Sequence, residues 1–220
     1  MYIGEILSQK FCEVRPSDTI QKGLDKMAEL HLSYLPVVSN NEFLGLVQED
    51  ELLSHDNEDN IIQNMKLNLA PLYLYEYQHV YDAMLYLSNY KTDILPILNK
   101  ENQYVGIVTA QDVIQALNSI QSNNESGAII VLEIGAKDNA LSHIAHIIES
   151  DNASILSTAI KTSPDSSKLE LTIKVNKTNI ASLVSTLWRF DYVVKATFND
   201  GNDENDLQQR YDLLMNYLNL

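Results

Sequence analysis

Apolar residues recur in the first half of the chain as two copies of one pattern. Residues 12–53 align with residues 72–114 at an offset of 60. The offset becomes 61 after the polar turn between the two apolar strands, where the second copy has one extra residue. Each copy reads as a short extended segment, a helix, two apolar strands around a polar turn, and a second helix. The pattern therefore predicts two β-α-β-β-α units. Because one copy cannot bury its apolar faces alone, we expect the two to pair through their sheets.

The boundaries of these elements follow from the spacing of apolar residues and from capping signals. Asp18 and Thr19 can cap a helix that carries Ile20, Leu24 and Met27 on one side. The predicted strands are 12–14, 35–38 and 43–47 in the first copy and 72–74, 94–98 and 104–108 in the second. The last helix of each copy opens near Gln48 or Thr109.

The second half has a different order of elements. Strands are predicted at 128–134, 153–162, 169–175 and 192–198, with a helix over 179–190. Another helix follows the first strand, has Asp138 or Asn139 as its cap, and places four apolar residues on one side: Leu141, Ile144, Ala145 and Ile148. The order is β-α-β-β-α-β, a ferredoxin-like split βαβ arrangement.

The whole chain is thus predicted to be α+β with four parts. Residues 1–120 hold the paired repeats (about 1–60 and 61–120), 121–127 a polar linker, and 128–200 the ferredoxin-like domain. Residues 201–220 hold an acidic segment and an amphipathic helix. The apolar stripe of that helix is Leu207, Tyr211, Leu214 and Leu218. It is expected to dock on its own protein or a twin subunit, with a partner protein as the alternative.

Charge and composition exclude several classes of function. The chain has 15 Lys and Arg against 30 Asp and Glu, a formal net charge of −15. Such a surface repels nucleic-acid phosphates and anionic membranes, so neither is an expected partner. No signal peptide or membrane span is expected from the hydropathy pattern. The single cysteine, Cys12, suits a reducing compartment, so a cytoplasmic location is expected.

The two copies also share a specific motif. The second copy reads DILPIL at 93–98 and YVGIVTAQDVI at 104–114, and the first reads YLPVV at 34–38 and GLV at 45–47. Each copy thus has a proline-bearing strand, a polar turn, and a strand with glycine followed by two apolar residues. This pattern resembles a CBS domain, and the tandem resembles a CBS pair covering about half of the chain.

The resemblance implies a site for an adenosyl ligand at the end of the second copy. The family's ribose-binding positions fall on Thr109 and Asp112, where a carboxylate can accept hydrogen bonds from two vicinal hydroxyls. The family's adenine-pocket positions fall on Phe11, Cys12 and Glu13, with Ile107 and Val108 beneath. Thr109 and Asp112 also fit a plain helix N-cap, so both interpretations stay open.

Two departures from the family pattern narrow the expected ligand. Gln48 and Glu51 replace the threonine and aspartate in the first copy, so at most one competent site is expected. Phosphate-binding CBS pairs place a basic residue just before the strand proline, where this chain has Ser33-Tyr34 and Asp93-Ile94. Adenosine, AMP or S-adenosylmethionine therefore fits better than a polyphosphate, and an empty, purely structural pair also fits.

The element order of 128–200 resembles an ACT domain. A CBS pair followed by an ACT-like domain is similar to the acetoin-utilisation type of regulator. ACT domains often bind an amino acid at the loop after the first strand, which falls here on residues 135–139. Pairing of ACT-like sheets between subunits is the other use that the resemblance implies, and a homodimer through the CBS or ACT-like parts is expected.

No catalytic arrangement is recognised. The glycine-rich phosphate loops and the Gly-x-Ser-x-Gly elbow are absent. His143, His146 and Glu149 share one face of a predicted helix, which is read as solvated rather than as a metal site. The sequence therefore predicts a non-enzymatic regulatory module that needs no cofactor or metal and senses an adenosyl-type molecule through a homodimer. A ligand-free interaction scaffold is the alternative.

Overall fold

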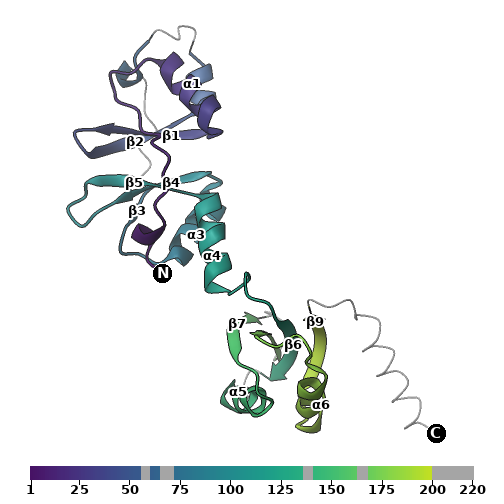
Figure 1. The fold of residues 1–220 in the computed structure, drawn as a ribbon. Coiled ribbons are helices and arrows are strands. Elements are labelled where there is room, and N and C mark those ends of the chain that lie inside the picture. Colours follow the sequence, from purple (N-terminus) through teal and green to yellow (C-terminus); the bar gives the residue numbers. More distant parts are fainter. Residues whose placement is uncertain (56–59, 65–71, 136–140, 163–167, 200–220) are drawn as a thin grey trace. The chain divides into compact units, whose positions relative to one another are not determined.

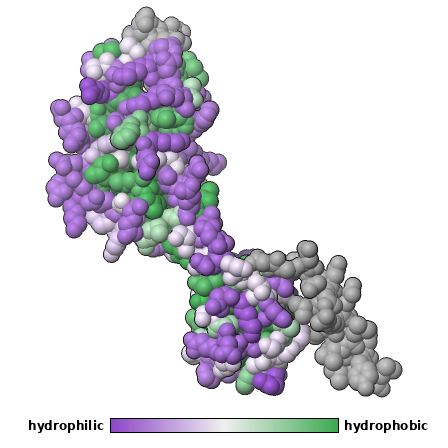
Figure 2. Space-filling view, in the orientation of Figure 1, coloured by the Kyte–Doolittle hydropathy of each residue, from purple (hydrophilic) through white to green (hydrophobic). Residues whose placement is uncertain are grey.

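The computed structural model describes residues 1–55, 60–64, 72–135, 141–162 and 168–199 (Figure 1). The chain divides into two compact units, Met1–Leu117 and Asn118–Leu220. The predicted α+β class is confirmed, since both units combine helices with small sheets. Hydrophilic residues cover most of the visible surface of each unit, as the strong net charge leads one to expect (Figure 2).

Repeat one of the first unit contains the elements α1 (Ile20–Leu30), β1 (Tyr34–Ser39), β2 (Glu42–Gln48) and α2 (Glu49–Leu53). Thr19 caps α1 as predicted, because its side chain accepts a hydrogen bond from the amide of Lys22. The predicted strand at 12–14 is reduced to one parallel bridge between Val14 and Val37. A short 3-10 helix, η1 (Ile3–Ile6), precedes this repeat.

Repeat two has the same plan, with β3 (Leu74–Tyr75), α3 (Val80–Tyr90), β4 (Ile94–Leu98), β5 (Tyr104–Thr109) and α4 (Ala110–Ile120). Another short 3-10 helix, η2 (Ile62–Asn64), lies in the connection between the repeats. The β4–β5 hairpin is irregular between Ile97 and Leu98, at the position where the β1–β2 hairpin is irregular between Val37 and Val38. The internal repeat seen in the sequence is therefore also a structural repeat.

The two hairpins form the core of the first unit. Their inward side chains are fully or almost fully buried, because strands covered on both faces carry continuous apolar runs. In Figure 1 the β1–β2 and β4–β5 hairpins lie next to each other, with α1 beside the first and α3 and α4 beside the second. The fully buried strand residues include Leu35, Val37, Val47, Ile94, Leu95, Ile97, Ile107 and Val108.

The second unit has the predicted β-α-β-β-α-β order. Its elements are β6 (Ala128–Gly135), α5 (Leu141–Ser150), β7 (Ile155–Thr162), β8 (Lys168–Val175), α6 (Ala181–Arg189) and β9 (Val193–Asn199). The antiparallel sheet has the order β7-β8-β6-β9, which is the ferredoxin-like arrangement. Both helices pack on one face of the sheet and share its core. Ile147 joins Ile144 and Ile148 on the buried side of α5, where the sequence pattern had placed Ala145.

Parts of the sequence prediction lie outside the described residues. These are the amino-acid-binding loop expected at 135–139 beyond residue 135, with the capping residues Asp138 and Asn139 in it, and the C-terminal helix in 201–220. The polar segment 121–127 is described, and hydrogen bonds hold it in place. The amide of Asn123 donates to the carbonyl of Asn118, and the Lys174 ammonium of β8 donates to the carbonyl of Ser122 at 2.7 Å.

Candidate functional site

Thr109 and Asp112 lie together where β5 turns into α4. The hydroxyl of Thr109 donates to Asp112 Oδ2 at 2.6 Å, and the Thr109 amide donates to the same oxygen at 2.8 Å. The amide of Asp112 in turn donates to Thr109 Oγ1 at 3.2 Å. These three bonds form a reciprocal N-cap, so the capping role is real. Asp112 Oδ1 accepts no hydrogen bond from the other described residues.

A polar pocket of about 480 Å³ lies beside Asp112. The amide of Ser8 donates to the carbonyl of Ile107 at 2.9 Å, which fixes the N-terminal segment against β5. The Lys10 ammonium donates to the carbonyl of Leu30 at 3.1 Å and is the single cation of the pocket lining. The pocket is lined by Glu5, Ile6, Leu7, Ser8, Gln9, Lys10, Gln111, Asp112, Gln115 and Ala116.

The other five predicted site residues are distributed around this region. Ile107, Val108 and Cys12 are fully buried and belong to the core, whereas 81% of Phe11 is exposed. Glu13 lines a different pocket from Asp112. The structure therefore brings Thr109 and Asp112 together and does not place Glu13 in the same pocket.

The thiol of Cys12 is unreactive, although the residue was predicted to belong to the adenine pocket. Burial, reinforced by the negative charge of Glu13, raises the pKa of its thiol to about 12. The thiol therefore stays protonated at neutral pH, and a protonated thiol is a poor nucleophile.

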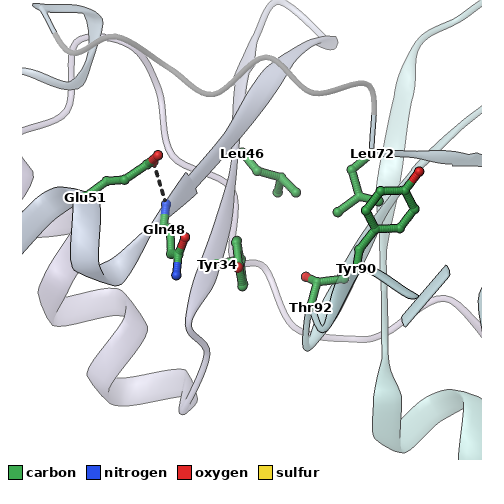
Figure 3. Close-up of a pocket in the computed structure, with 7 residues that line it drawn as sticks. All are labelled: Tyr34, Leu46, Gln48, Glu51, Leu72, Tyr90 and Thr92. Atoms are coloured by element: carbon green, nitrogen blue, oxygen red, sulfur yellow. Dashed lines mark hydrogen bonds between the residues drawn. The ribbon is translucent and has the colours of Figure 1, made fainter. Parts of the chain in front are cut away.

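The first copy forms a pocket around Gln48 and Glu51, the counterparts of Thr109 and Asp112 (Figure 3). Glu51 Oε2 accepts a hydrogen bond from the amide of Gln48 at 3.3 Å, a looser version of the Thr109–Asp112 contact. The pocket measures about 150 Å³ and takes residues from both repeats. Its lining residues are Tyr34, Leu46, Gln48, Glu51, Leu72, Tyr90 and Thr92.

Sequence reasoning named Tyr34 only as a position that lacks a basic residue, and it did not identify Lys10 as a pocket residue. Tyr34 lies in the first-copy pocket, and burial together with the negative charge of Asp93 raises the pKa of its hydroxyl, which keeps it a hydrogen-bond donor. The offset of 60 that pairs Tyr34 with Ile94 was a signal that could have found it. Lys10 carried no such signal, because it precedes the aligned part of the repeat.

Asp93 occupies the position before the strand proline where a basic residue was noted as missing. Its Oδ2 accepts a hydrogen bond from the amide of Ser33 at 2.6 Å, so it joins the two repeats at equivalent positions. Its Oδ1 is buried and has no hydrogen-bond partner among the described residues. A carboxylate rather than a cation therefore lies at this junction, which disfavours the binding of a phosphate there.

Neither a metal site nor a membrane-spanning helix is found among the described residues. Within them, no group of three or more His, Cys, Asp or Glu side chains converges to hold a metal ion. His143 instead contacts the hydroxyl of Tyr192 at 2.8 Å. No helix of the described part is long and apolar enough to cross a membrane.

Comparison with known proteins identifies the first unit. The family model of the CBS domain matches residues 3–58 and 67–119. A CBS domain pair/ACT domain protein (TM0892) from Thermotoga maritima has a similar fold, with a TM-score of 0.50 and 24% identity. That similarity covers 54% of this chain and 98% of the Thermotoga chain.

Two curated relatives match over 118 residues each. An uncharacterized protein of Methanocaldococcus jannaschii is 23% identical over 53% of this chain, and a homoserine O-acetyltransferase of Methanococcus vannielii is 21% identical over 50% of it. The matches span 39% and 24% of the lengths of these relatives. The CBS pair fold, the internal repeat and the match of both copies to the family model agree. The chain is therefore a CBS-domain protein, and its residues 3–58 and 67–119 form a CBS domain pair.

Proposed function

We propose that the CBS pair is a non-enzymatic regulatory module that binds an adenosyl-type small molecule, such as adenosine, AMP or S-adenosylmethionine, beside Asp112. The observation that carries the proposal is the geometry of this carboxylate. Its Oδ2 is held by Thr109, its Oδ1 accepts no hydrogen bond in the described part of the chain, and the residue lines a pocket of about 480 Å³. A carboxylate fixed in this way is ready to accept hydrogen bonds from ribose hydroxyls.

The charges of the pocket favour a ligand with little negative charge. Glu5 and Asp112 are acidic, and Lys10 is the one cation in the lining. Lys10 can balance a single phosphate such as that of AMP, whereas a triphosphate would leave most of its charge unpaired in a chain of net charge −15. The expected order of affinity is therefore adenosine, S-adenosylmethionine and AMP ahead of ATP.

The regulatory output is proposed to pass through a homodimer. Apolar side chains on α3 and α4 are exposed in the isolated chain: Tyr81 is 46% exposed, Met84 47%, Leu85 54% and Ile114 58%. Exposed apolar residues that gather on neighbouring helices are typical of an interface. The ferredoxin-like unit is proposed to act as an ACT-like domain that also pairs with its copy, so that a ligand shifts the arrangement of the subunits.

A ligand-free scaffold is the second candidate function. Its support is the reciprocal N-cap, which accounts for both Thr109 and Asp112 without any ligand. The two candidates differ in one measurable property, the binding of a nucleoside.

Isothermal titration calorimetry with adenosine, AMP, ATP and S-adenosylmethionine tests the proposal. Asp112→Asn keeps a side-chain oxygen for the cap but replaces the free oxygen with a hydrogen-bond donor, so affinity is expected to fall by at least about tenfold. Glu51→Gln, at the equivalent position of the first copy, is the matched control and is expected to leave the affinity unchanged. Absence of heat with all four ligands, or equal affinity in Asp112→Asn, would favour the scaffold.

A further inference from the structure

A third pocket of the first unit lies at the opposite end of β1 from Tyr34. It measures about 620 Å³, a size typical of small-molecule sites. It includes neither Thr109 nor Asp112 and shares no residue with the first-copy pocket of Figure 3. The residues that line it are Glu13, Arg15, Pro16, Ser17, Val38, Ser39, Asn40, Asn41, Gln63 and Tyr104.

Backbone hydrogen bonds from four segments build this pocket. The amide of Val38 donates to the carbonyl of Val14, which lays residues 13–17 along the end of β1. The amide of Tyr104 donates to the carbonyl of Asn41 and brings β5 of repeat two to the β1–β2 turn. The amide of Gln63 donates to the carbonyl of Pro16. The walls are thus held by regular main-chain contacts.

The internal repeat explains why the pocket is open in repeat one. At the offset of 60, Glu13, Arg15 and Ser17 correspond to three tyrosines, Tyr73, Tyr75 and Tyr77.

In repeat two those three rings pack in a row. The ring centroids of Tyr73 and Tyr75 lie 5.6 Å apart, and those of Tyr75 and Tyr77 lie 5.2 Å apart. Tyr73 also meets Phe43, the counterpart of Tyr104, at 6.2 Å, and the hydroxyl of Tyr75 donates to Asn102 at 2.9 Å. The pocket is therefore open in repeat one because the two repeats share a backbone plan but carry different side chains at these positions.

Two opposite charges in the lining make no side-chain hydrogen bond or ion pair within the described residues, although the Arg15 guanidinium attracts the Asp18 carboxylate electrostatically. The backbone amide of Arg15 is bonded to Asp18 Oδ2 at 2.8 Å, but its guanidinium makes no hydrogen bond or ion pair there. The carbonyl of Glu13 accepts the Lys26 ammonium at 2.8 Å, while its carboxylate has no hydrogen bond in the described part. A pocket wall that offers a cation and an anion together fits a ligand that carries both.

The remaining polar groups of the lining are hydroxyls and amides. Ser17 and Ser39 offer hydroxyls, and Asn40 and Asn41 form a turn in which both residues have positive φ. Burial and the nearby charge of Glu13 raise the pKa of the Tyr104 hydroxyl, so this group stays protonated. These groups can hydrogen-bond a polar ligand without adding net charge.

We propose that this pocket binds a small zwitterion, specifically a free α-amino acid. The planar guanidinium of Arg15 receives the carboxylate, for which its fork of donors is suited, and the carboxylate of Glu13 receives the ammonium group. The side chain of the amino acid then faces Ser39, Asn40 and Tyr104. This site is separate from the adenosyl site proposed above, and the two would let one CBS pair respond to two kinds of metabolite.

Calorimetry on the full chain with each of the twenty proteinogenic amino acids at millimolar concentration tests the proposal. At least one is expected to bind. Its N-acetyl and its carboxamide derivatives, which remove one charge each, are expected to bind at least about tenfold more weakly. Absence of binding by all twenty, or undiminished binding of both derivatives, would overturn the proposal.

Two variants place the binding in this pocket. Arg15→Gln removes the guanidinium, and Ser17→Tyr introduces the ring that Tyr77 supplies in repeat two. Both variants are expected to lower the affinity for the amino acid at least about tenfold. Arg15→Gln is expected to leave the affinity for adenosine unchanged. Amino-acid binding that survives both variants would place the ligand elsewhere, for instance in the ferredoxin-like unit, and would refute the proposal. Because adenosine is titrated separately, the absence of amino-acid binding can be told apart from the absence of adenosine binding.

Discussion

At the scale of single residues, Asp112 combines a structural and a proposed binding role because its two oxygens are used differently. One oxygen receives both hydrogen bonds from Thr109, at 2.6 and 2.8 Å, which fixes the direction of the other. The carboxylate of Glu51 accepts one hydrogen bond, from the amide of Gln48 at 3.3 Å, within a looser capping box, and its side chain has one more rotatable bond. The second copy is therefore better preorganised for a ligand than the first.

The buried state of Cys12 predicts its reactivity. Because burial raises the pKa of the thiol to about 12, almost no thiolate exists at about pH 8, and the core shields the sulfur. Native protein is expected to react with a disulfide reagent such as Ellman's only at its unfolding rate, whereas protein in urea reacts at once. Cys12→Ser is the blank. Rapid stoichiometric reaction of the native protein would contradict the described burial.

Sequence alone singled out Thr109 and Asp112 as a pair because their spacing matches a known motif within one segment, and the two residues contact each other. Their role in ligand binding stays a prediction. Sequence alone could not predict that Glu13 and Asp112 line different pockets, or that Lys10 lies beside Asp112. Those positions depend on contacts such as the bond from Ser8 to Ile107, which join segments far apart in the chain. Motif matching reports neighbours along the sequence, whereas pockets are built by neighbours in space.

At the scale of elements, apolar periodicity predicted the helices and strands well because both halves bury a clear face. The alternation of 169–175 became β8, in which Leu171, Ile173 and Val175 are buried. The strand predicted at 12–14 failed as a full strand, because only Val14 pairs there. Short extended segments owe their state to a neighbouring strand, and their own sequence carries little signal.

Gly127, which directly precedes β6, has no room for a side chain. A Cβ atom at this position would come within 1.9 Å of the carbonyl oxygen of Val175, which is backbone and cannot move aside cheaply. Gly127→Ala is therefore expected to destabilise the second unit by about 1–3 kcal/mol, the usual cost of overpacking. Urea unfolding followed by circular dichroism measures it.

Gly4→Ala is the matched control for that experiment. Its added Cβ would meet Glu76 at 3.2 Å, a contact that a small shift relieves. The control is expected to change the free energy of unfolding by less than Gly127→Ala does. Equal effects of the two substitutions would show that the contact with Val175 is not what limits residue 127.

At the scale of the whole molecule, a strongly acidic chain presents two units with different structural plans. The CBS pair carries all three pockets described above, and the ferredoxin-like unit carries a separate core. The net charge of −15 and the acidic residue at the repeat junction both disfavour polyphosphates. The element order predicted both units, whereas the choice of ligand depends on individual side chains.

The proposed homodimer gives a prediction at this scale. A Met84→Lys, Leu85→Lys double variant places two charges in the exposed apolar surface of α3. Light scattering is expected to give a molar mass of about twice 24.9 kDa for the wild type, as a dimer, and of 24.9 kDa for the variant, as a monomer. Ala28→Lys, at an exposed position of α1 outside the proposed interface, is the control and should remain dimeric. A monomeric wild type, or a dimeric double variant, would exclude this surface as the interface.

The most direct test of the central claim is an NMR titration of nitrogen-15-labelled protein with adenosine, because it reports where the ligand lies. The account predicts saturable shifts of the amides of Ser8, Lys10, Gln111 and Asp112, which line the pocket at the start of α4. Shifts confined to Tyr34, Gln48 and Tyr90 would assign the ligand to the first-copy pocket. Those shifts, or none at saturating adenosine, would contradict the claim that Asp112 holds the ribose.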